Sequence, residues 1–263
     1  MTVVSLASGS GGNAYCVTAS SGETLLVDCG VSCRCLESRC RDAGIDPGSI
    51  SAAVFTHDHI DHVRGVPGFL KRHPGVALYA NWMTAEATLG TLARERRTLP
   101  ESAFALFENG QRFCAGPFSI VPFPIPHDVP DPVGFMIEVD GMTYFHATDV
   151  GTPLDSIGAH LACADVATLE FNHDCTLLAR SGRPECLKRR IRGGRGHLSN
   201  DDAAELVRRF AGRRMRALAL AHLSEECNAP HLALDAARDA LAAASLASIE
   251  PVALSQTSAV RVF

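Results

Sequence analysis

The chain has 263 residues, 46% of them hydrophobic, which is enough for one large domain with a substantial core. Its 24 basic and 29 acidic residues give a formal net charge of −5, which argues against a protein that binds anions over its whole surface. No apolar run approaches the roughly 20 residues of a membrane span, and the N-terminus lacks a basic, apolar leader, so we expect a cytoplasmic protein with no membrane association.

The first half of the chain alternates short apolar runs with turns rich in Gly, Ser and Asn, a pattern typical of a β-meander. A helix is expected over residues 33–43, and a second helix, ended by Pro100, includes residues 89–97. Asp140-Gly141 predicts a two-residue hairpin turn. The predicted strands of this half cover residues 3–6, 14–18, 24–27, 51–56, 118–125, 133–139 and 142–147.

The second half is more helical. Ser199, followed by Asp202, predicts the start of a helix that runs to about residue 210, and an Ala-rich helix is expected over 231–244. Both halves repeat a rhythm of strands followed by helices, without an internal sequence repeat. We therefore predict one domain, residues 1–263, in which two sheets pack face to face with helices outside. The predicted strands of this half cover residues 164–171, 215–221, 252–254 and 259–263.

Four of the ten cysteines lie close together in the sequence and could be interpreted as a soft-metal site. Their C-x3-C-x-C-x4-C spacing fits no common zinc or iron–sulfur pattern. Reduced structural thiols are the favoured interpretation, because a free cysteine behaves as a small buried hydrophobe. The four are Cys29, Cys33, Cys35 and Cys40.

A cluster of potential metal ligands follows the predicted strand at 51–56. His57 and His59 are two residues apart on the turn leaving this strand, so both can point into one cleft. Asp61 and His62 follow directly and can face a second point a few ångströms away. Because four ligands on so short a segment rarely serve one ion, further ligands are expected downstream.

Three polar residues follow later apolar strands, where active sites of layered α/β folds are built. His127 follows the strand at 118–125, Asp149 ends the hairpin strand, and His222 comes directly after the strand at 215–221. Taken alone, such a histidine is more often a hydrogen-bonded loop residue and such an aspartate a turn cap. Their order after the first cluster favours metal ligation.

A basic segment stands out in this acidic chain, with seven basic residues in sixteen positions and only Glu185 against them. A solvated helix face is the usual explanation of such a run. Its position directly before His197 instead favours contact with a phosphate backbone, and the lack of interleaved aromatic residues argues against base stacking. We expect little sequence preference. The seven are Arg180, Arg183, Lys188, Arg189, Arg190, Arg192 and Arg195.

Two further histidines and a glycine-rich turn have open roles. His197 precedes the helix capped by Ser199, so it lies near a positive helix end and either contacts the substrate or protonates a leaving group. His173 is either a substrate contact or a residue that orients a ligand. The turn at 8–13 either brings backbone N–H groups close to an anion or is only a tight turn.

The order His57-x-His59-x-Asp61-His62, His127, Asp149 and His222 resembles the metallo-β-lactamase fold superfamily. Further segments are similar to its YycJ (WalJ) branch. Gly11 departs from this branch, where a second serine is usual, and so does Cys227, where a polar residue is commoner. The similar segments are Ser8-Gly9-Ser10-Gly11-Gly12-Asn13, residues 170–174, residues 187–191, residues 196–200, and residues 221–224 with Asn228.

The resemblance implies an α/β (α+β) fold, an αββα four-layer sandwich, with two divalent metal ions. It implies that His57, His59 and His127 hold one metal. The other would be held by Asp61, His62 and His222, with Asp149 bridging. Nitrogen and oxygen ligands suit zinc, manganese or iron.

The function that follows is a binuclear-metal-dependent phosphodiesterase, a 5′ exonuclease acting on the DNA backbone. A metal-bridging hydroxide would attack phosphorus, with Asp61 balancing the metals and His197 as the second catalytic residue, protonating the leaving oxygen. The expected substrate contacts are Lys188, Arg189, Arg190, His173, Ser224 and Asn228.

Two alternatives remain from the sequence. A hydrolase of small thioesters or lactones could use the same metals and would not need the basic segment. A metal-stabilised nucleic-acid-binding module without turnover would bind DNA and not cleave it.

Overall fold

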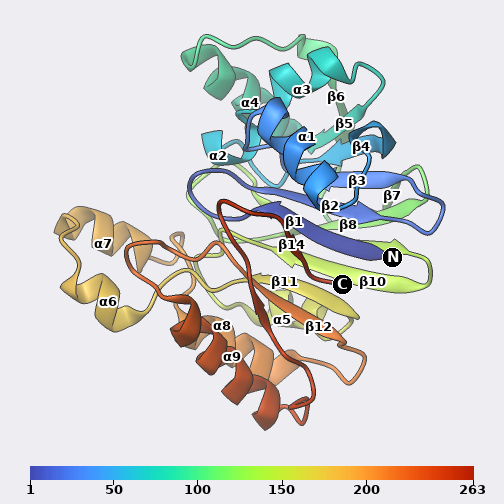
Figure 1. Ribbon diagram of the computed structural model, residues 1–263. Coiled ribbons are helices and arrows are strands. Elements are labelled where there is room, and N and C mark those ends of the chain that lie inside the picture. The colour runs from blue at the N-terminus through green and yellow to red at the C-terminus, as the bar shows by residue number, and fades with distance from the viewer.

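The computed structural model describes residues 1–263 and has four layers, with two facing sheets in the middle and helices on both outer faces (Figure 1). The prediction of an αββα sandwich is confirmed. The first sheet has the order β14-β1-β2-β3-β4-β5-β6 and the second β13-β12-β11-β10-β9-β8-β7. In each sheet an antiparallel part is followed by parallel strands, at β3-β4-β5-β6 and at β10-β11-β12-β13.

The strands of the first sheet are β1 (Thr2–Ala7), β2 (Ala14–Thr18), β3 (Thr24–Val27), β4 (Ile50–Val54), β5 (Ala77–Asn81), β6 (Phe104–Phe107) and β14 (Val260–Arg261). The strands of the second sheet are β7 (Phe113–Ala115), β8 (Phe118–Pro124), β9 (Val133–Val139), β10 (Met142–Ala147), β11 (Val166–Glu170), β12 (Ala217–Ala221) and β13 (Val252–Ala253).

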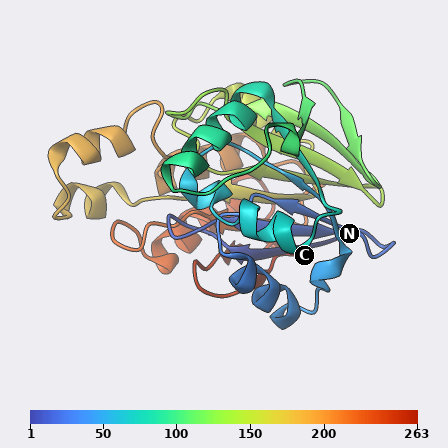
Figure 2. The same ribbon diagram turned by 90° about the horizontal axis from the view of Figure 1, so that it is seen from above.

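Helices lie on the outer face of each sheet, and a pair of short helices projects to one side of the sandwich (Figure 2). This pair, α6 (Cys175–Arg180) and α7 (Glu185–Ile191), is called the α6–α7 arm below. The first sheet is accompanied by α1 (Cys33–Asp42), η1 (Pro47–Ser49), α2 (Ile60–Val63), α3 (Val66–Arg72), α4 (Trp82–Arg94) and η2 (Glu101–Ala103). The second is accompanied by α5 (Asp155–Leu161), α8 (Asn200–Phe210) and α9 (Pro230–Ala243).

Three hydrophobic cores of similar size separate the four layers, which explains why both faces of each sheet are apolar. One core of 22 buried residues lies between the sheets and includes Tyr15, Phe118 and Phe135. A core of 23 lies under α1, α3 and α4, and a core of 25 lies under α5, α8 and α9.

Local sequence features predicted the position of several turns and helix ends. Ser199 caps α8, with its hydroxyl accepting a hydrogen bond from the backbone N–H of Asp202 at 3.1 Å. Asp140 and Gly141 both have positive φ, 54° and 71°, as the predicted two-residue hairpin turn requires. The helix expected to include residues 89–97 ends at Arg94, because Arg96 adopts a left-handed conformation with φ 56°.

Several short elements were not predicted, among them β5, β6, β7, α3 and α5. α3 contains Pro67 and Gly68, which weaken a helical pattern. These elements have 3 to 7 residues, too few for a hydrophobic period to show. None of the helices has the length and apolar content needed to cross a bilayer.

Candidate metal centre

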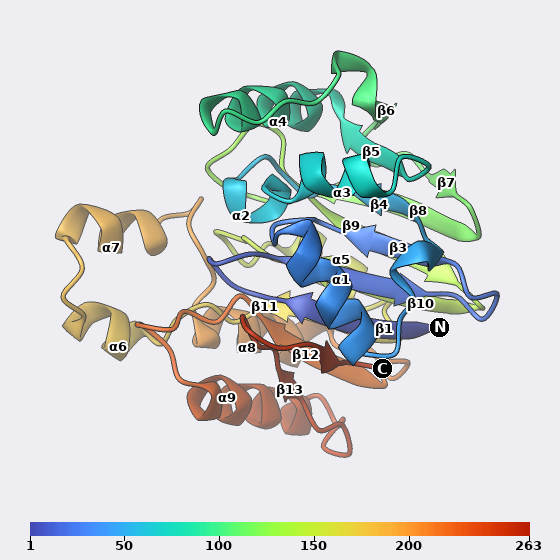
Figure 3. The ribbon, with the colours of Figure 1, turned by 45° about the horizontal axis from the view of Figure 1, so that its top comes forward.

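The seven predicted ligands meet at one edge of the sandwich, where the C-terminal ends of four strands come together. Residues 56–62 run from the end of β4 into α2, and His127, Asp149 and His222 follow β8, β10 and β12. Figure 3 shows these strand ends on the same side of the molecule as the α6–α7 arm. The structure therefore gathers residues separated by 165 positions in the sequence, from His57 to His222.

The ligand atoms form overlapping groups in which all atoms lie within 4.8 Å of one another. Asp149 lies between two of them, with Oδ2 3.3 Å from Nε2 of His62 and Oδ1 3.9 Å from Nε2 of His127. These distances allow the two oxygens of the Asp149 carboxylate to contact ligand atoms of two neighbouring groups. The groups are His57, His59 and His127; Asp61, His62 and His222; and His57, His62 and Asp149.

Several of these buried atoms have no hydrogen-bond partner. They are Nε2 of His57, Nε2 of His222 and Oδ2 of Asp149. Leaving such atoms unpaired away from water destabilises the folded state, so their presence at one edge of the sandwich needs an explanation. Imidazole nitrogen and carboxylate oxygen form the donor set of a divalent cation such as zinc or manganese, and the residues therefore fit a metal.

Tight backbone packing brings the first ligand segment to this edge. A Cβ on Gly30 would lie 1.5 Å from the backbone oxygen of Asp61, so only glycine permits this approach. Beside it, the backbone N–H of Asn13 donates to the same Asp61 oxygen at 2.8 Å. Asp149 and His222 adopt left-handed conformations, with φ 60° and 55°, which is unusual outside glycine and typical of functional sites.

Asp28 orients the ligand His62. Its carboxylate is fully buried and lies 2.8 Å from Nδ1 of His62, and it also accepts hydrogen bonds from the backbone N–H and the hydroxyl of Thr56. A carboxylate on Nδ1 fixes the ring so that Nε2 points into the ligand cluster. No role was predicted for Asp28, although a carboxylate directly after the apolar run Leu25-Leu26-Val27 is a usable signal.

Glu170 connects a ligand with His197. It ends β11 and is fully buried, and its Oε1 accepts hydrogen bonds from Nδ1 of His197 at 2.8 Å and Nδ1 of His222 at 3.1 Å. Its Oε2 accepts from the backbone N–H groups of Val150 and Leu198. The sequence analysis included Glu170 in a similar segment and gave it no role, although its place at the end of a buried strand matches that of the ligands.

The histidines of the cluster fall into two electrostatic groups. Burial lowers the pKa of His57, His59 and His127, so these rings are neutral, the form that binds a cation. Burial acts in the same direction on His62 and His222, but neighbouring carboxylates outweigh it and raise the pKa of both.

The same contacts lower the pKa of two buried carboxyl groups, those of Asp149 and Glu170. The imidazoles of His222 and His62 hold the pKa of Asp149 well below its usual value in spite of complete burial. Burial likewise opposes ionisation of Glu170, yet His197 and His222 lower its pKa to about 2. Both carboxyl groups are therefore ionised at neutral pH and can attract a cation.

A pocket of about 170 Å³ opens beside the ligand cluster, against the α6–α7 arm. Arg190 reaches it from α7, with Nε 2.5 Å from Oδ2 of Asp128, and Arg183 reaches it from the arm's loop, paired with Glu226. Only two of its eleven lining residues are hydrophobic. The lining residues are Ser10, His127, Asp128, Asn172, Arg183, Leu187, Arg190, Ile191, Gly196, His197 and Ser224.

Two of the predicted substrate contacts, Arg190 and Ser224, line this pocket, as does the predicted catalytic His197. Lys188 does not, because it is buried within the arm, where its Nζ donates to the backbone oxygen of Ala179 at 2.9 Å. Arg189 does not line it either, and its Nε lies 3.4 Å from the backbone oxygen of Glu185.

His173 and Asn228, which were also predicted to contact the substrate, do not line this pocket. Asn228 is buried, and its Nδ2 donates to the backbone oxygen of Phe171 and to Oδ1 of Asn200. His173 is buried and forms a β-bridge with Ser199. The sequence analysis did not identify Ser10, Asn172 or Asp128 as pocket residues.

All ten cysteines are free, in agreement with the prediction of reduced thiols. Of the four clustered in the sequence, only Cys33 belongs to a group of three potential metal ligands, with Glu37 and His73. Both oxygens of Glu37 are already held by Arg72, at 2.7 and 3.0 Å, so this group is an ion-pair network.

Comparison with known proteins gives a consistent family. The model of the beta-lactamase superfamily domain matches residues 23–218. The chain is 35% identical over 228 residues to the exodeoxyribonuclease WalJ of Streptococcus pneumoniae, covering 87% of this chain and 83% of that protein. It is 29% identical over 231 residues to the exodeoxyribonuclease YycJ of Bacillus anthracis, covering 87% and 84%.

Solved structures share the fold. The metallo-beta-lactamase fold protein YhfI of Bacillus subtilis has a TM-score of 0.70 at 19% identity, covering 99% of this chain and 98% of that one. The Zn2+-bound PqqB of Methylobacterium extorquens has a TM-score of 0.69 at 18% identity, covering 99% of both chains.

Proposed function

The chain belongs to the beta-lactamase superfamily and is a metal-dependent hydrolase, and from this premise we propose that it is an exonuclease that cleaves the phosphodiester backbone of DNA. The observation that carries the proposal is the contact between the ligand cluster and a small cationic pocket. His127 belongs to both, and Arg190 and Arg183 enter the pocket from the α6–α7 arm. This combination suits a phosphodiester, because guanidinium groups bind phosphate oxygens and metal ions held by such ligands would activate the attacking water.

We propose two metal positions. One ion would be held by His57, His59 and His127, and the other by Asp61, His62 and His222, with Asp149 between them. Within each of these groups of three the ligand atoms lie within 4.8 Å of one another. When bound, the ions supply an acidified water and neutralise negative charge on the phosphoryl oxygens. Asp28 and Glu170 keep His62 and His222 in the orientation that binding requires.

The chain's own groups would position the phosphate and supply a proton. Arg190 and Arg183 attract the phosphate, and the hydroxyls of Ser10 and Ser224 lie in the same pocket to accept or donate hydrogen bonds. His197 is one-fifth exposed and faces the pocket, while Glu170 accepts the proton of its Nδ1. Burial opposes a charge on this ring, but the Glu170 carboxylate outweighs it and raises the pKa of His197, so the ring carries a proton on each nitrogen and Nε2 can give its proton to the departing sugar oxygen.

Substrate size and the relatives support DNA degradation from an end. A volume of 170 Å³ corresponds to about six water molecules at roughly 30 Å³ each, enough for one phosphate group and its immediate surroundings. WalJ and YycJ are both named exodeoxyribonucleases. We propose 5′ polarity on the sequence resemblance. A hydrolase of thioesters or lactones is less well supported, because only Leu187 and Ile191 offer apolar surface to an acyl group.

The test is cleavage of DNA labelled at its 5′ or 3′ end, single- and double-stranded, with zinc, manganese or iron(II) added. We expect the label on 5′-labelled DNA to be released at once as a short product. The 3′-labelled strand should instead shorten gradually and keep its label. Asp61→Ala should reduce hydrolysis below detection, because Asp61 lies 3.6 Å from Nε2 of His62 and 3.7 Å from Nε2 of His222 in the ligand cluster.

Asp239→Ala, at an exposed position on α9, is the matched control and should cleave normally. Normal turnover by the Asp61→Ala variant with its metal content retained would refute the assignment. DNA binding without cleavage under all three metals would favour a binding module without turnover. Hydrolysis of thioesters or lactones without cleavage of DNA would favour the other rival.

A further inference from the structure

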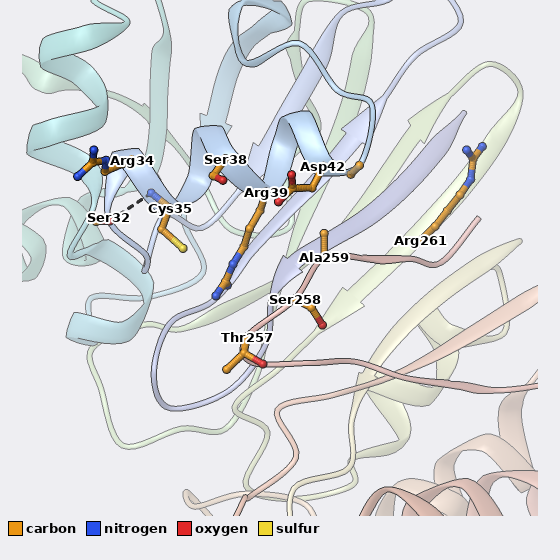
Figure 4. Close-up of a pocket in the computed structure, with 11 residues that line it drawn as sticks. Ser32, Arg34, Cys35, Ser38, Arg39, Asp42, Thr257, Ser258, Ala259 and Arg261 are labelled. Atoms are coloured by element: carbon orange, nitrogen blue, oxygen red, sulfur yellow. Dashed lines mark hydrogen bonds between the residues drawn. The ribbon is translucent and has the colours of Figure 1, made fainter.

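A groove of about 770 Å³ lies between α1 and the C-terminal segment that leads into β14 (Figure 4). Three arginines line it, Arg34 and Arg39 from α1 and Arg261 from β14, against a single carboxylate, that of Asp42. We propose that this groove binds the sugar–phosphate backbone of DNA several nucleotides away from the bond that is cleaved. The inference rests on the proposed function and extends the DNA path beyond the metal centre.

The charges in the groove are available to a ligand. Arg34 has no hydrogen-bond or ion-pair partner, and Arg261 makes only a 3.4 Å contact from Nη2 to the hydroxyl of Thr2. Arg39 is fixed, because its Nη1 donates to the backbone oxygens of Leu6 and Gln256 at 3.0 and 3.1 Å. In a chain of net charge −5, an excess of two positive charges in one groove is a local field that attracts a polyanion.

The residues that line the groove favour contact with the DNA backbone over contact with the bases. Four hydroxyl side chains lie along the groove, two on the α1 wall and two on the C-terminal wall, and no aromatic side chain is among the lining residues. Hydroxyls and guanidinium groups are donors to phosphate oxygens, whereas base recognition in single strands relies on stacking. The hydroxyls belong to Ser32, Ser38, Thr257 and Ser258.

Gln256 joins the groove to the rim of the metal centre. Its backbone oxygen accepts from Arg39, and its side-chain Oε1 accepts from the backbone N–H of Gly11 at 2.7 Å. Gly11 follows Ser10, which lines the pocket beside the metal ligands. Nη1 of Arg64 lies 3.5 Å from the Gly11 oxygen, and Nε2 of Gln256 donates to Oε1 of Glu225 at 2.9 Å, so one cation and one carboxylate stand at this junction. Gln256 and the turn at Gly11 therefore connect the lining of the groove with that of the pocket.

Gly11 is the position that departs from the serine usual in the YycJ (WalJ) branch, and the structure shows what the departure permits. A Cβ at Gly11 would lie 2.8 Å from Cδ of Gln256, so a serine would push this side chain aside. Glycine here lets Gln256 lie against the turn and form this connection.

The length of the groove sets the length of strand it can hold. α1 has 10 residues and is about 15 Å long at 1.5 Å per residue, which spans about four nucleotides at 3.4 Å per nucleotide of a B-form strand. Gly30, three residues before α1, contacts Asp61, so α1 begins beside the metal ligands. A strand of four nucleotides at the metal centre would not fill the groove, whereas one of 20 would.

The test compares the binding of short and long DNA. Fluorescein-labelled, phosphorothioate-linked single strands of 4 and 20 nucleotides are titrated with the metal-loaded protein and followed by anisotropy. The Arg34→Glu/Arg261→Glu variant should bind the 20-mer at least about tenfold more weakly at 100 mM salt. Its slope of log K against log salt should be shallower by about 1.4, two single-strand phosphate contacts at 0.7 each. Its affinity for the 4-mer should stay within twofold of the wild type.

Arg213→Glu, an exposed arginine in the loop between α8 and β12 without a partner, is the matched charge-reversal control and should bind both strands as the wild type does. Arg34→Ala/Arg261→Ala should give the same length-dependent loss at smaller size, and circular dichroism melting checks that each variant is folded.

Equal weakening of both strands, or unchanged binding of the 20-mer, would overturn the groove assignment while the wild type still cleaves DNA. A wild-type chain that neither binds nor cleaves DNA would overturn the proposed function, and the groove assignment with it.

Discussion

At the scale of single residues, the geometry of the candidate metal centre depends on two carboxylates that do not line the pocket. Asp28 and Glu170 are fully buried, and each holds Nδ1 of a ligand histidine, His62 and His222 respectively. Glu170 also holds His197, so one side chain fixes both a ligand and the proposed proton donor. Each histidine keeps Nε2 free to act because its other nitrogen is occupied.

Replacing Glu170 tests this coupling. Glu170→Gln removes the charge, and its NH2 group cannot accept from the backbone N–H groups of Val150 and Leu198 as Oε2 does, so the amide must either lose those bonds or turn its oxygen away from both rings. We expect kcat on DNA to fall at least about 100-fold and metal affinity to fall about 10- to 100-fold, while KM changes little because Glu170 does not line the pocket.

The readouts are steady-state kinetics and metal analysis of the purified variant. Glu170→Asp keeps the charge with a shorter reach and should recover part of kcat. A change confined to KM would show that Glu170 acts on substrate binding, and the positioning role would then be wrong.

At the scale of elements, the α6–α7 arm shows why a basic run does not translate directly into a basic surface. Lys188, Arg189 and Arg190 are consecutive on α7, and successive side chains on a helix point about 100° apart. Lys188 therefore turns into the arm, Arg189 turns back toward Glu185, and only Arg190 reaches the pocket.

Neighbouring arginines on α7 provide a matched pair of variants. Arg190→Ala should raise KM for DNA about tenfold and reduce the salt slope of binding by about 1, because a charged contact to phosphate is lost. It also leaves Asp128 unpaired beside the phosphate site, which acts in the same direction. Arg189→Ala should stay within twofold of the wild type. KM measured at several salt concentrations gives the answer, and equal effects of both substitutions would contradict this orientation of the helix.

At the scale of the whole molecule, the sandwich brings strand ends from both sheets to one edge, and so brings buried polar groups together there. Nε2 of His57, Nε2 of His222 and Oδ2 of Asp149 lack partners within the protein. Since unpaired buried donors and acceptors destabilise the folded state, ions that satisfy them must stabilise it.

Removal of metal should therefore lower thermal stability. A ligand present at 1,000 times its Kd stabilises the folded state by about 4 kcal/mol, which corresponds to about 8–16 °C in Tm at 2–4 °C per kcal/mol. We expect EDTA to lower Tm by this order, and zinc or manganese to restore it in a calorimetric scan. His57→Ala, which removes a ligand, should show a much smaller EDTA effect. An unchanged Tm for the wild type in EDTA would argue against tightly bound ions.

The sequence by itself determined the two-sheet architecture and the seven candidate ligands. Both depend on local features: apolar runs of strand length, and polar residues such as His127 and His222 that stand directly after them. Because β-strands of one sheet run to common edges, a polar residue at a strand end is close to other such residues wherever they lie in the chain.

Only the tertiary structure decided which side chains support these ligands and which meet the substrate pocket. Asp28, Glu170 and Asp128 act through partners 34, 52 and 62 positions away, and no local pattern records such a pairing. The direction of each side chain on α7, and the contact of Gln256 with Gly11 across 245 positions, depend on how the layers pack. Packing is a property of the whole chain, so these features became visible only once the sheets and helices were assembled.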